Sequence, residues 1–148
     1  MIDAIDTTIL QHLERDGRVT NLQLAERVGL SPSACLRRVQ ALEAAGVIKG
    51  YRAILDRTQL GAGLTVFVMV GLSGQLQRDA LAFERAMAKA PEVLECHHVT
   101  GSVEYLLRVE VSDLAAYKHF HSDVLGTLSQ VSSITSYVCL GSSKDLRD

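Results

Sequence analysis

The sequence has no long apolar run, few cysteines and no leader-like start, and each absence removes a class of protein. No apolar segment approaches the roughly 20 residues that a membrane-spanning helix requires. The three cysteines, at positions 35, 96 and 139, are odd in number and widely spaced, which predicts reduced thiols and no disulfide framework. The first residues, MIDAID, lack the basic and apolar regions of a secretory signal. We therefore expect a cytoplasmic protein without membrane contacts.

Recognisable catalytic and metal-binding arrangements are missing as well. We find no phosphate-binding loop, nucleophile elbow or pair of catalytic carboxylates. His97 and His98 are neighbours on a predicted strand and point to opposite faces. His119 and His121 lie two positions apart on a predicted helix, about 200° around its axis. Neither pair can share an ion, so we predict no metal, no cofactor and no enzymatic activity.

The charge is small overall but unevenly distributed. The net charge of the 148 residues is −2, whereas the segment from Arg27 to Arg57 holds six basic and two acidic residues, a local balance of +4. A basic patch on a mildly acidic protein is typical of a local nucleic-acid contact. Apolar residues make up 47% of the chain, which is enough for one large domain or two small ones.

The segment 20–46 predicts two short helices joined by a tight turn. Thr20 and Gln23 have the spacing of a capping box, and Gly29 can adopt the left-handed conformation that ends a helix. Ser31 then caps a second helix with Pro32 at its first position, and Gly46 ends it. A first helix over 3–16, capped by Asp3, would supply the third wall of a small core. This pattern predicts a helix-turn-helix domain.

The periodicity assigns faces to the two short helices. Inward positions are Leu22, Ala25 and Val28 in the first and Cys35, Val39 and Leu42 in the second, with Leu36 beside them. Outward positions in the second helix are Ser33, Ala34, Arg37, Arg38 and Ala41. Small residues at the start of the helix let its backbone approach the edges of the DNA bases, and arginines can bind guanine edges or phosphates. We predict DNA contacts from Ser31, Ser33, Ala34, Arg37 and Arg38; the alternative is an ordinary helical hairpin with a solvated face.

The segment after this domain is expected to be extended. Residues 47–55, VIKGYRAIL, have strand composition, and Lys49 and Arg52 within them can contact phosphates or simply be solvated charges. Residues 56–63 have the polar and glycine content of a linker. We therefore divide the chain into a DNA-binding domain over 1–55, a linker over 56–63 and a second domain over 64–148.

The second domain alternates strands and helices. Strands are predicted over 64–72, 93–100, 104–111 and 133–140, and helices over 76–89 and 113–127. The order βαββαβ predicts a ferredoxin-like α+β fold, a four-stranded antiparallel sheet with both helices on one face. The other face carries large apolar residues such as Phe67 and Met69, so we expect a second copy to cover it in a homodimer.

Four stretches, in this order and spacing, resemble the Lrp/AsnC (leucine-responsive/asparagine-responsive, or feast-famine) family. They are IDTTILQHLERDGR, LAERVGLSPSACLRRVQALEAAGVIKGY, ECHHVTG and EYLLRVEV. The resemblance implies a sequence-specific, DNA-binding transcriptional regulator of amino-acid or nitrogen metabolism. It also implies a C-terminal domain that dimerises, often assembles to an octamer, and binds a small amino acid between domains near the turn after VTG.

The turn itself departs from the family pattern. Many amino-acid-responsive members read Gly-Asp-aromatic-Asp, whereas this chain reads Gly101-Ser102-Val103-Glu104. The resemblance assigns effector binding to Thr100 and to this turn, with backbone N–H groups on the carboxylate and Glu104 on the ammonium. The alternatives are a plain hairpin turn with a solvated Glu104 in an effector-independent DNA-binding architectural regulator, or a tetrapyrrole decarboxylase, since some of these enzymes are similar in architecture.

Overall fold

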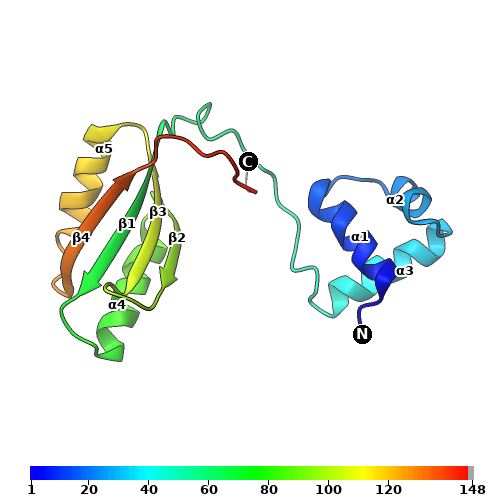
Figure 1. Cartoon of the computed structure of the whole chain (residues 1–148), viewed down its shortest axis with the longest axis horizontal. Coiled ribbons are helices and arrows are strands. Elements are labelled where there is room, and N and C mark those ends of the chain that lie inside the picture. The colour runs from blue at the N-terminus through cyan, green and yellow to red at the C-terminus, as the bar shows by residue number, and fades with distance from the viewer. Residues whose placement is uncertain (147–148) are drawn as a thin grey trace. The chain divides into compact units, whose positions relative to one another are not determined.

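The computed structural model describes residues 1–146 and divides into two compact units, Met1–Ile54 and a second that begins at Leu55 (Figure 1). The final residues of the predicted 64–148 domain, 147 and 148, lie outside the described part. Each unit has its own apolar core. Among residues 1–146 no helix is long and apolar enough to cross a bilayer.

The first unit contains three helices, α1 (Ala4–Arg15), α2 (Asn21–Val28) and α3 (Pro32–Ala44). All three predicted N-terminal caps are confirmed. Asp3 accepts a hydrogen bond from the Asp6 N–H, Thr20 and Gln23 form a reciprocal capping box, and Ser31 accepts from the Ala34 N–H. Gly29 ends α2 with φ 72°, a left-handed conformation that glycine adopts without steric cost. The tight turn into α3 therefore follows from the residues that flank it.

The core of this unit contains a residue that the periodicity missed. The fully or nearly fully buried apolar residues are Ile9, Leu24, Ala25, Cys35 and Leu42. Leu24 is 2% exposed, whereas Leu22, which was predicted to face inward, is 67% exposed. Ala25 is buried and Val28 packs against the core as the pattern predicts, so the apolar stripe of α2 is 24–25–28 rather than 22–25–28. Leu36 on α3 is also exposed, at 44%.

The predicted strand over 47–55 is wrong. No residue of this segment is assigned to a strand, and every one of them except Ile48 is exposed. A strand needs a neighbour to pair its backbone N–H and C=O groups. Within residues 1–146 no strand pairs with this segment, so β-branched composition alone does not produce a strand here.

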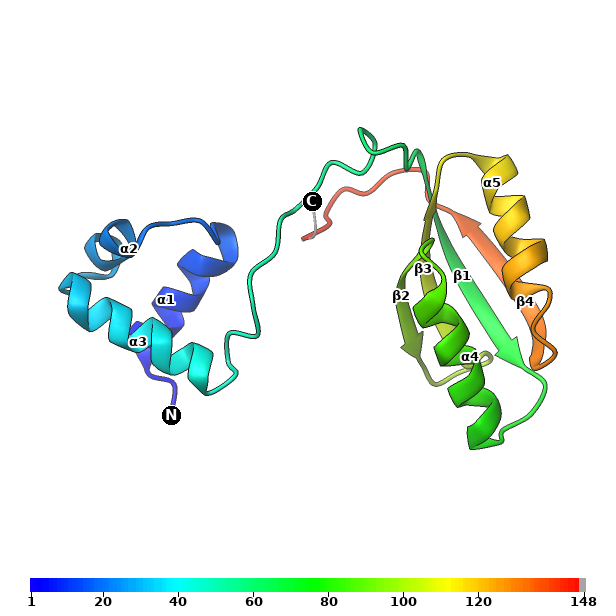
Figure 2. The ribbon, with the colours of Figure 1, turned by 180° about the vertical axis from the view of Figure 1, so that it is seen from behind.

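The second unit is the predicted ferredoxin-like sandwich. Its elements in chain order are β1 (Leu64–Leu72), α4 (Gln77–Lys89), β2 (Val93–His98), β3 (Tyr105–Val111), α5 (Leu114–His119), the π-helix η1 (Phe120–Leu125) and β4 (Val131–Val138). The strands pair antiparallel in the order β2-β3-β1-β4. Both helical segments cover one face of the sheet (Figures 1 and 2).

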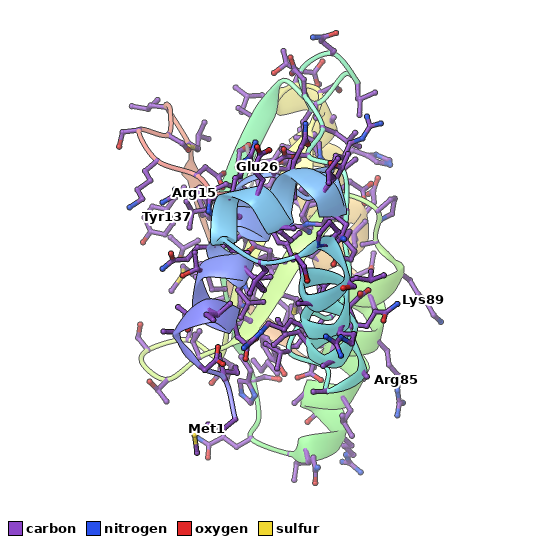
Figure 3. All side chains as sticks on the ribbon, turned by 90° about the vertical axis from the view of Figure 1, so that its right-hand side faces the viewer. Met1, Arg15, Glu26, Arg85, Lys89 and Tyr137 are labelled. Atoms are coloured by element: carbon purple, nitrogen blue, oxygen red, sulfur yellow. The ribbon has the colours of Figure 1, made fainter. Side chains whose placement is uncertain are left out.

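Alternation along the strands decides which face is buried. Val66, Val68 and Val70 of β1 are fully buried and face the helices, as do Tyr105 and Leu107 of β3. The other face, called here the outer face, carries Phe67 paired with Tyr137 and Met69 paired with Leu106. Figure 3 shows Tyr137 projecting on the side opposite to Arg85 and Lys89 of α4. The outer face is thus partly apolar, and no helix of the described part of the second unit, 55–146, covers it.

The predicted helix over 113–127 changes its form partway. After His119 the backbone widens to a π-turn, in which the Gly126 N–H donates to the His121 C=O, five residues back, at 2.9 Å. Phe120 at the start of this segment and Leu125 at its end are both fully buried. Leu114, at the start of α5, is 63% exposed.

Candidate DNA-binding and effector sites

The outward surface of α3 carries polar side chains and one large apolar side chain, Leu36. The side chains of Ser33, Leu36, Arg37 and Gln40 are exposed, whereas Ala34 is half-buried. Ser31, at the N-cap, is exposed and lies 3.4 Å from the Ser33 hydroxyl, oxygen to oxygen. The N-terminal half of α3 therefore presents small and hydrogen-bonding groups, as a helix that enters the major groove requires.

Arg38 does not face outward as predicted. Its Nη1 donates to Asp3 Oδ2 at 2.7 Å and to Asp6 Oδ1 at 2.9 Å, both at the start of α1. The helix turns about 100° per residue, so Arg38 lies roughly 60° from the buried Cys35 and 100° from its neighbour Arg37. That position borders the core and brings the guanidinium to α1. A DNA contact from Arg38 depends on the part of the side chain that these acids leave free.

The group formed by Arg38, Asp3 and Asp6, called here the α1–α3 clasp, is electrostatically matched. The Asp6 N–H and the Arg38 guanidinium lower the pKa of Asp3 from its ordinary value. The side chain of Asp6 is only 13% exposed, and that of Arg38 is 32% exposed. The sequence showed Asp3 as a cap and Asp6 as an acid in the first turn of α1. It gave no sign that both would meet an arginine 32 to 35 positions away.

Lys49 and Arg52 follow α3 on the exposed segment 47–55. Both side chains are exposed. Their predicted phosphate contacts no longer come from a strand, because the segment is unpaired. They remain cations next to the candidate DNA-binding helix in the chain, and a contact with phosphate stays a prediction.

The turn between β2 and β3 brings the five predicted effector residues together. Thr100, Gly101 and Ser102 are exposed, and Val103 and Glu104 are half-buried. Gly101 has φ 127°, a conformation that side chains rarely adopt. Apart from Gly101 and its two chain neighbours, no described residue has an atom within 4 Å of the position that a Cβ would occupy there, so the backbone is open on that side. The Val99 N–H closes the turn by donating to the Glu104 C=O at 2.9 Å.

Glu104 has a structural partner that the sequence did not predict. Its Oε2 accepts a hydrogen bond from the Leu72 N–H at 2.7 Å, and its own N–H donates to the Val70 C=O at 3.2 Å. Leu72 lies at the irregularity in the β1–β4 pairing, where one strand register ends and the next begins. The carboxylate thus satisfies, through Oε2, an N–H group at the end of β1. Glu104 is a brace of the turn as well as a candidate ligand group.

The histidines lie as the sequence predicted on β2. His98 stacks on the buried Tyr105 with ring centroids 4.7 Å apart, and His97 lies 3.6 Å from Glu95 (Nε2 to Oε1). On the helix, His119 contacts Asp123 and His121 packs edge-on near Tyr117. Within residues 1–146 no three His, Cys, Asp or Glu side chains are grouped closely enough to hold a metal ion.

Family models match both units. The model described as Lrp/AsnC ligand binding domain matches residues 65–148, and the one described as winged helix-turn-helix DNA-binding matches residues 2–49. The leucine-responsive regulatory protein of Rhizobium meliloti is 42% identical over 144 residues, which cover 97% of this chain and 92% of that protein. The protein of the same name from Escherichia coli is 41% identical over 139 residues, 94% of this chain and 85% of that one.

Solved structures match the whole architecture. The transcriptional regulator NMB0573 of Neisseria meningitidis, solved as a complex with L-methionine, has a TM-score of 0.94 and 38% identity and covers 98% of this chain and 94% of its own. The feast or famine regulatory protein of M. tuberculosis, complexed with L-methionine, has a TM-score of 0.85 and 31% identity, with 98% and 96% covered. This chain belongs to the Lrp/AsnC family of DNA-binding transcriptional regulators.

Proposed function

We propose that this protein regulates genes of amino-acid or nitrogen metabolism by binding duplex DNA as a symmetric homodimer. The observation that carries the proposal is the capped helix α3, which presents exposed Ser33 and Arg37 in its N-terminal half, and Gln40 just beyond it, from a small three-helix core. Ser31 and Ala34 lie at the same end of α3 and approach the DNA backbone or base edges. Lys49 and Arg52 add phosphate contacts.

The outer face of the sheet is the proposed dimer interface. It has no helix over it, and it carries Phe67, Met69, Leu106 and the 57% exposed Tyr137. Burial of these side chains against a second copy removes their apolar surface from water. An isologous pair of this kind also spaces two DNA-binding units symmetrically, as a palindromic operator requires. Assembly of such dimers to an octamer is the next step of the same proposal.

The effector site lies at the turn formed by Thr100, Gly101, Ser102, Val103 and Glu104, and its ligand is a small zwitterionic amino acid. We expect the open backbone at Gly101 to admit a carboxylate to the neighbouring N–H groups and Glu104 Oε1 to accept a hydrogen bond from an ammonium. Methionine is the first candidate, because two structural relatives were solved with it. Since Glu104 stands alone here without a second acid in the turn, its loss leaves the ammonium without a charged partner.

An effector-independent DNA-binding regulator is the second candidate function, favoured by the hydrogen bond that already engages Glu104. A tetrapyrrole decarboxylase of this architecture is a weaker candidate, since an enzyme gains nothing from the exposed Arg37. Absence of a Soret band and of any spectral change with siroheme would remove it.

A gel-shift assay with the DNA upstream of its own gene, with and without each common amino acid, tests the proposal. Retarded, salt-sensitive complexes that change with methionine or another amino acid support it. A purified, folded protein that binds no duplex DNA at 50 mM salt contradicts it. Light scattering in the same buffer separates a monomer from the expected dimer or octamer.

A further inference from the structure

Four exposed side chains of α3 lie on one side of the helix. At about 100° per residue, Ser33, Leu36, Arg37 and Gln40 fall within an arc of about 100°, opposite to the buried Cys35 and Leu42. Arg38 lies outside this arc and is engaged in the α1–α3 clasp. The arc, called here the reading face, is therefore not the set of small residues and two arginines that the sequence predicted.

Leu36 is the unexpected member of the reading face. Its side chain is 44% exposed, between polar neighbours and outside the buried core of its unit. A leucine at this place adds nothing to phosphate binding. The one apolar group on base edges in the major groove is the C5-methyl of thymine, which aliphatic side chains contact.

Gln40 lies one helical turn beyond Leu36 on the same arc. Its amide offers one donor and one acceptor side by side, which matches N7 and N6 of adenine. Four residues along a helix rise about 6 Å, less than two base-pair steps of about 3.4 Å. Leu36 and Gln40 therefore address the same or nearly adjacent base pairs.

We infer that the reading face makes this protein select a half-site in which the thymine methyl lies against Leu36, an adenine edge against Gln40 and a guanine edge against Arg37. Arg38 has a different role: through Asp3 and Asp6 it fixes how α3 is held on α1 and so where the reading face points. The inference rests on the proposed DNA binding by α3 and adds which bases that helix selects and which side chains select them.

The experiment begins with selection of duplexes from a random library by the full-length wild-type protein. Each thymine of the selected half-site is then replaced singly by deoxyuridine, which removes only the C5-methyl group, and affinity is measured by fluorescence anisotropy. We expect one position at which deoxyuridine weakens binding about fourfold, the effect of losing one methyl-sized apolar contact. The variant Leu36→Ala should bind the thymine and deoxyuridine duplexes equally.

Two further variants complete the design. Leu81→Ala removes a similarly exposed leucine (41%) from α4 in the second unit and should keep the full preference for thymine. Gln40→Ala should lose discrimination by about 5- to 150-fold at one adenine only, the range for a bidentate base contact. Melting temperatures near that of the wild type show that the variants are folded.

The outcomes separate the inference from the function beneath it. Wild-type protein that enriches no sequence, or binds without salt dependence, fails the proposed function itself. A selected half-site that contains no thymine, or one in which no deoxyuridine changes wild-type affinity, overturns the role of Leu36 and leaves DNA binding intact. Because the deoxyuridine series uses the wild-type protein alone, misfolding of a variant does not obscure this result.

Discussion

Helix α3 and the turn between β2 and β3 are the two candidate ligand surfaces, and each holds a charged side chain in a different way. Arg38 Nη1 donates hydrogen bonds to two carboxylates at the start of another helix, α1. Glu104 accepts one hydrogen bond from a backbone N–H, through Oε2. The reading face does not include Arg38, so the clasp takes no side chain away from it. The turn between β2 and β3, by contrast, has no second acid that could replace Glu104. The clasp therefore occupies Nη1 of Arg38 and leaves only the rest of its guanidinium for DNA, whereas the single bond of Glu104 leaves it among the candidate ligand groups.

The largest expected effect comes from the arginine that is not clasped. Arg37→Ala should weaken binding to the preferred operator by about 1–3 kcal/mol and relax specificity at one position, because it removes a side chain that reaches a base edge. Fluorescence anisotropy on preferred and scrambled duplexes measures both. Arg85→Ala, an exposed arginine on α4, is the matched control. An equal loss on all sequences would assign Arg37 to phosphate.

Breaking the clasp should affect stability before it affects DNA binding. Arg38→Ala leaves Asp6, whose side chain is 13% exposed, without its cationic partner. We expect a lower urea midpoint of unfolding, since the charged hydrogen bonds of a partly solvated site are lost. Urea unfolding measures it, and Arg37→Ala, at an exposed position, is the control. Unchanged stability would show that the clasp contributes nothing.

Two substitutions at Glu104 separate the brace from the ligand group. Glu104→Gln keeps an oxygen that can accept from the Leu72 N–H but removes the charge, so we expect little change in the melting temperature of the free protein. The rise in melting temperature caused by methionine should disappear. Glu104→Ala should lose the brace as well, at about 1 kcal/mol. A full methionine shift with Glu104→Gln would leave Glu104 as a brace alone.

The smallest expected effect is the pH dependence of the clasp. Because the pKa of Asp3 is lowered in the folded protein, its ionised form stabilises the fold above its ordinary pKa of 3.8, and this contribution is lost as pH falls through the folded pKa. Asp3→Asn still caps α1 but no longer titrates. Between about pH 5 and pH 3 its urea midpoint should fall less steeply than that of the wild type. Parallel slopes would remove Asp3 from the acid dependence.

The second unit was more predictable from sequence than the first, for a physical reason. Alternation along a strand assigns faces without ambiguity, and Val66, Val68 and Val70 are buried as expected. The apolar stripe of a helix is broader, so the pattern predicts Leu22 to be buried where the structure buries Leu24. The unpaired segment 47–55 and the π-turn after His119 depend on partners and hydrogen bonds that no local pattern specifies.

The candidate sites follow the same rule. The caps at Asp3, Thr20 and Ser31 join residues three positions apart and could be predicted. The contact of Arg38 with Asp6 spans 32 positions, as does that of Glu104 with Leu72. Such contacts depend on how the elements pack. The sequence therefore predicts which element carries each charged side chain but not the hydrogen-bond partner of that side chain.

The most direct test of the account is a salt titration of operator affinity for the wild type, Arg37→Ala and Arg38→Ala on one duplex. The account predicts that Arg38→Ala keeps the wild-type slope of log affinity against log salt and loses stability, while Arg37→Ala loses discrimination between operator and scrambled duplex and keeps its stability. If Arg38→Ala instead reduces the slope by about one phosphate contact and unfolds at the wild-type urea concentration, Arg38 is a DNA contact and the clasp assigned to it is wrong.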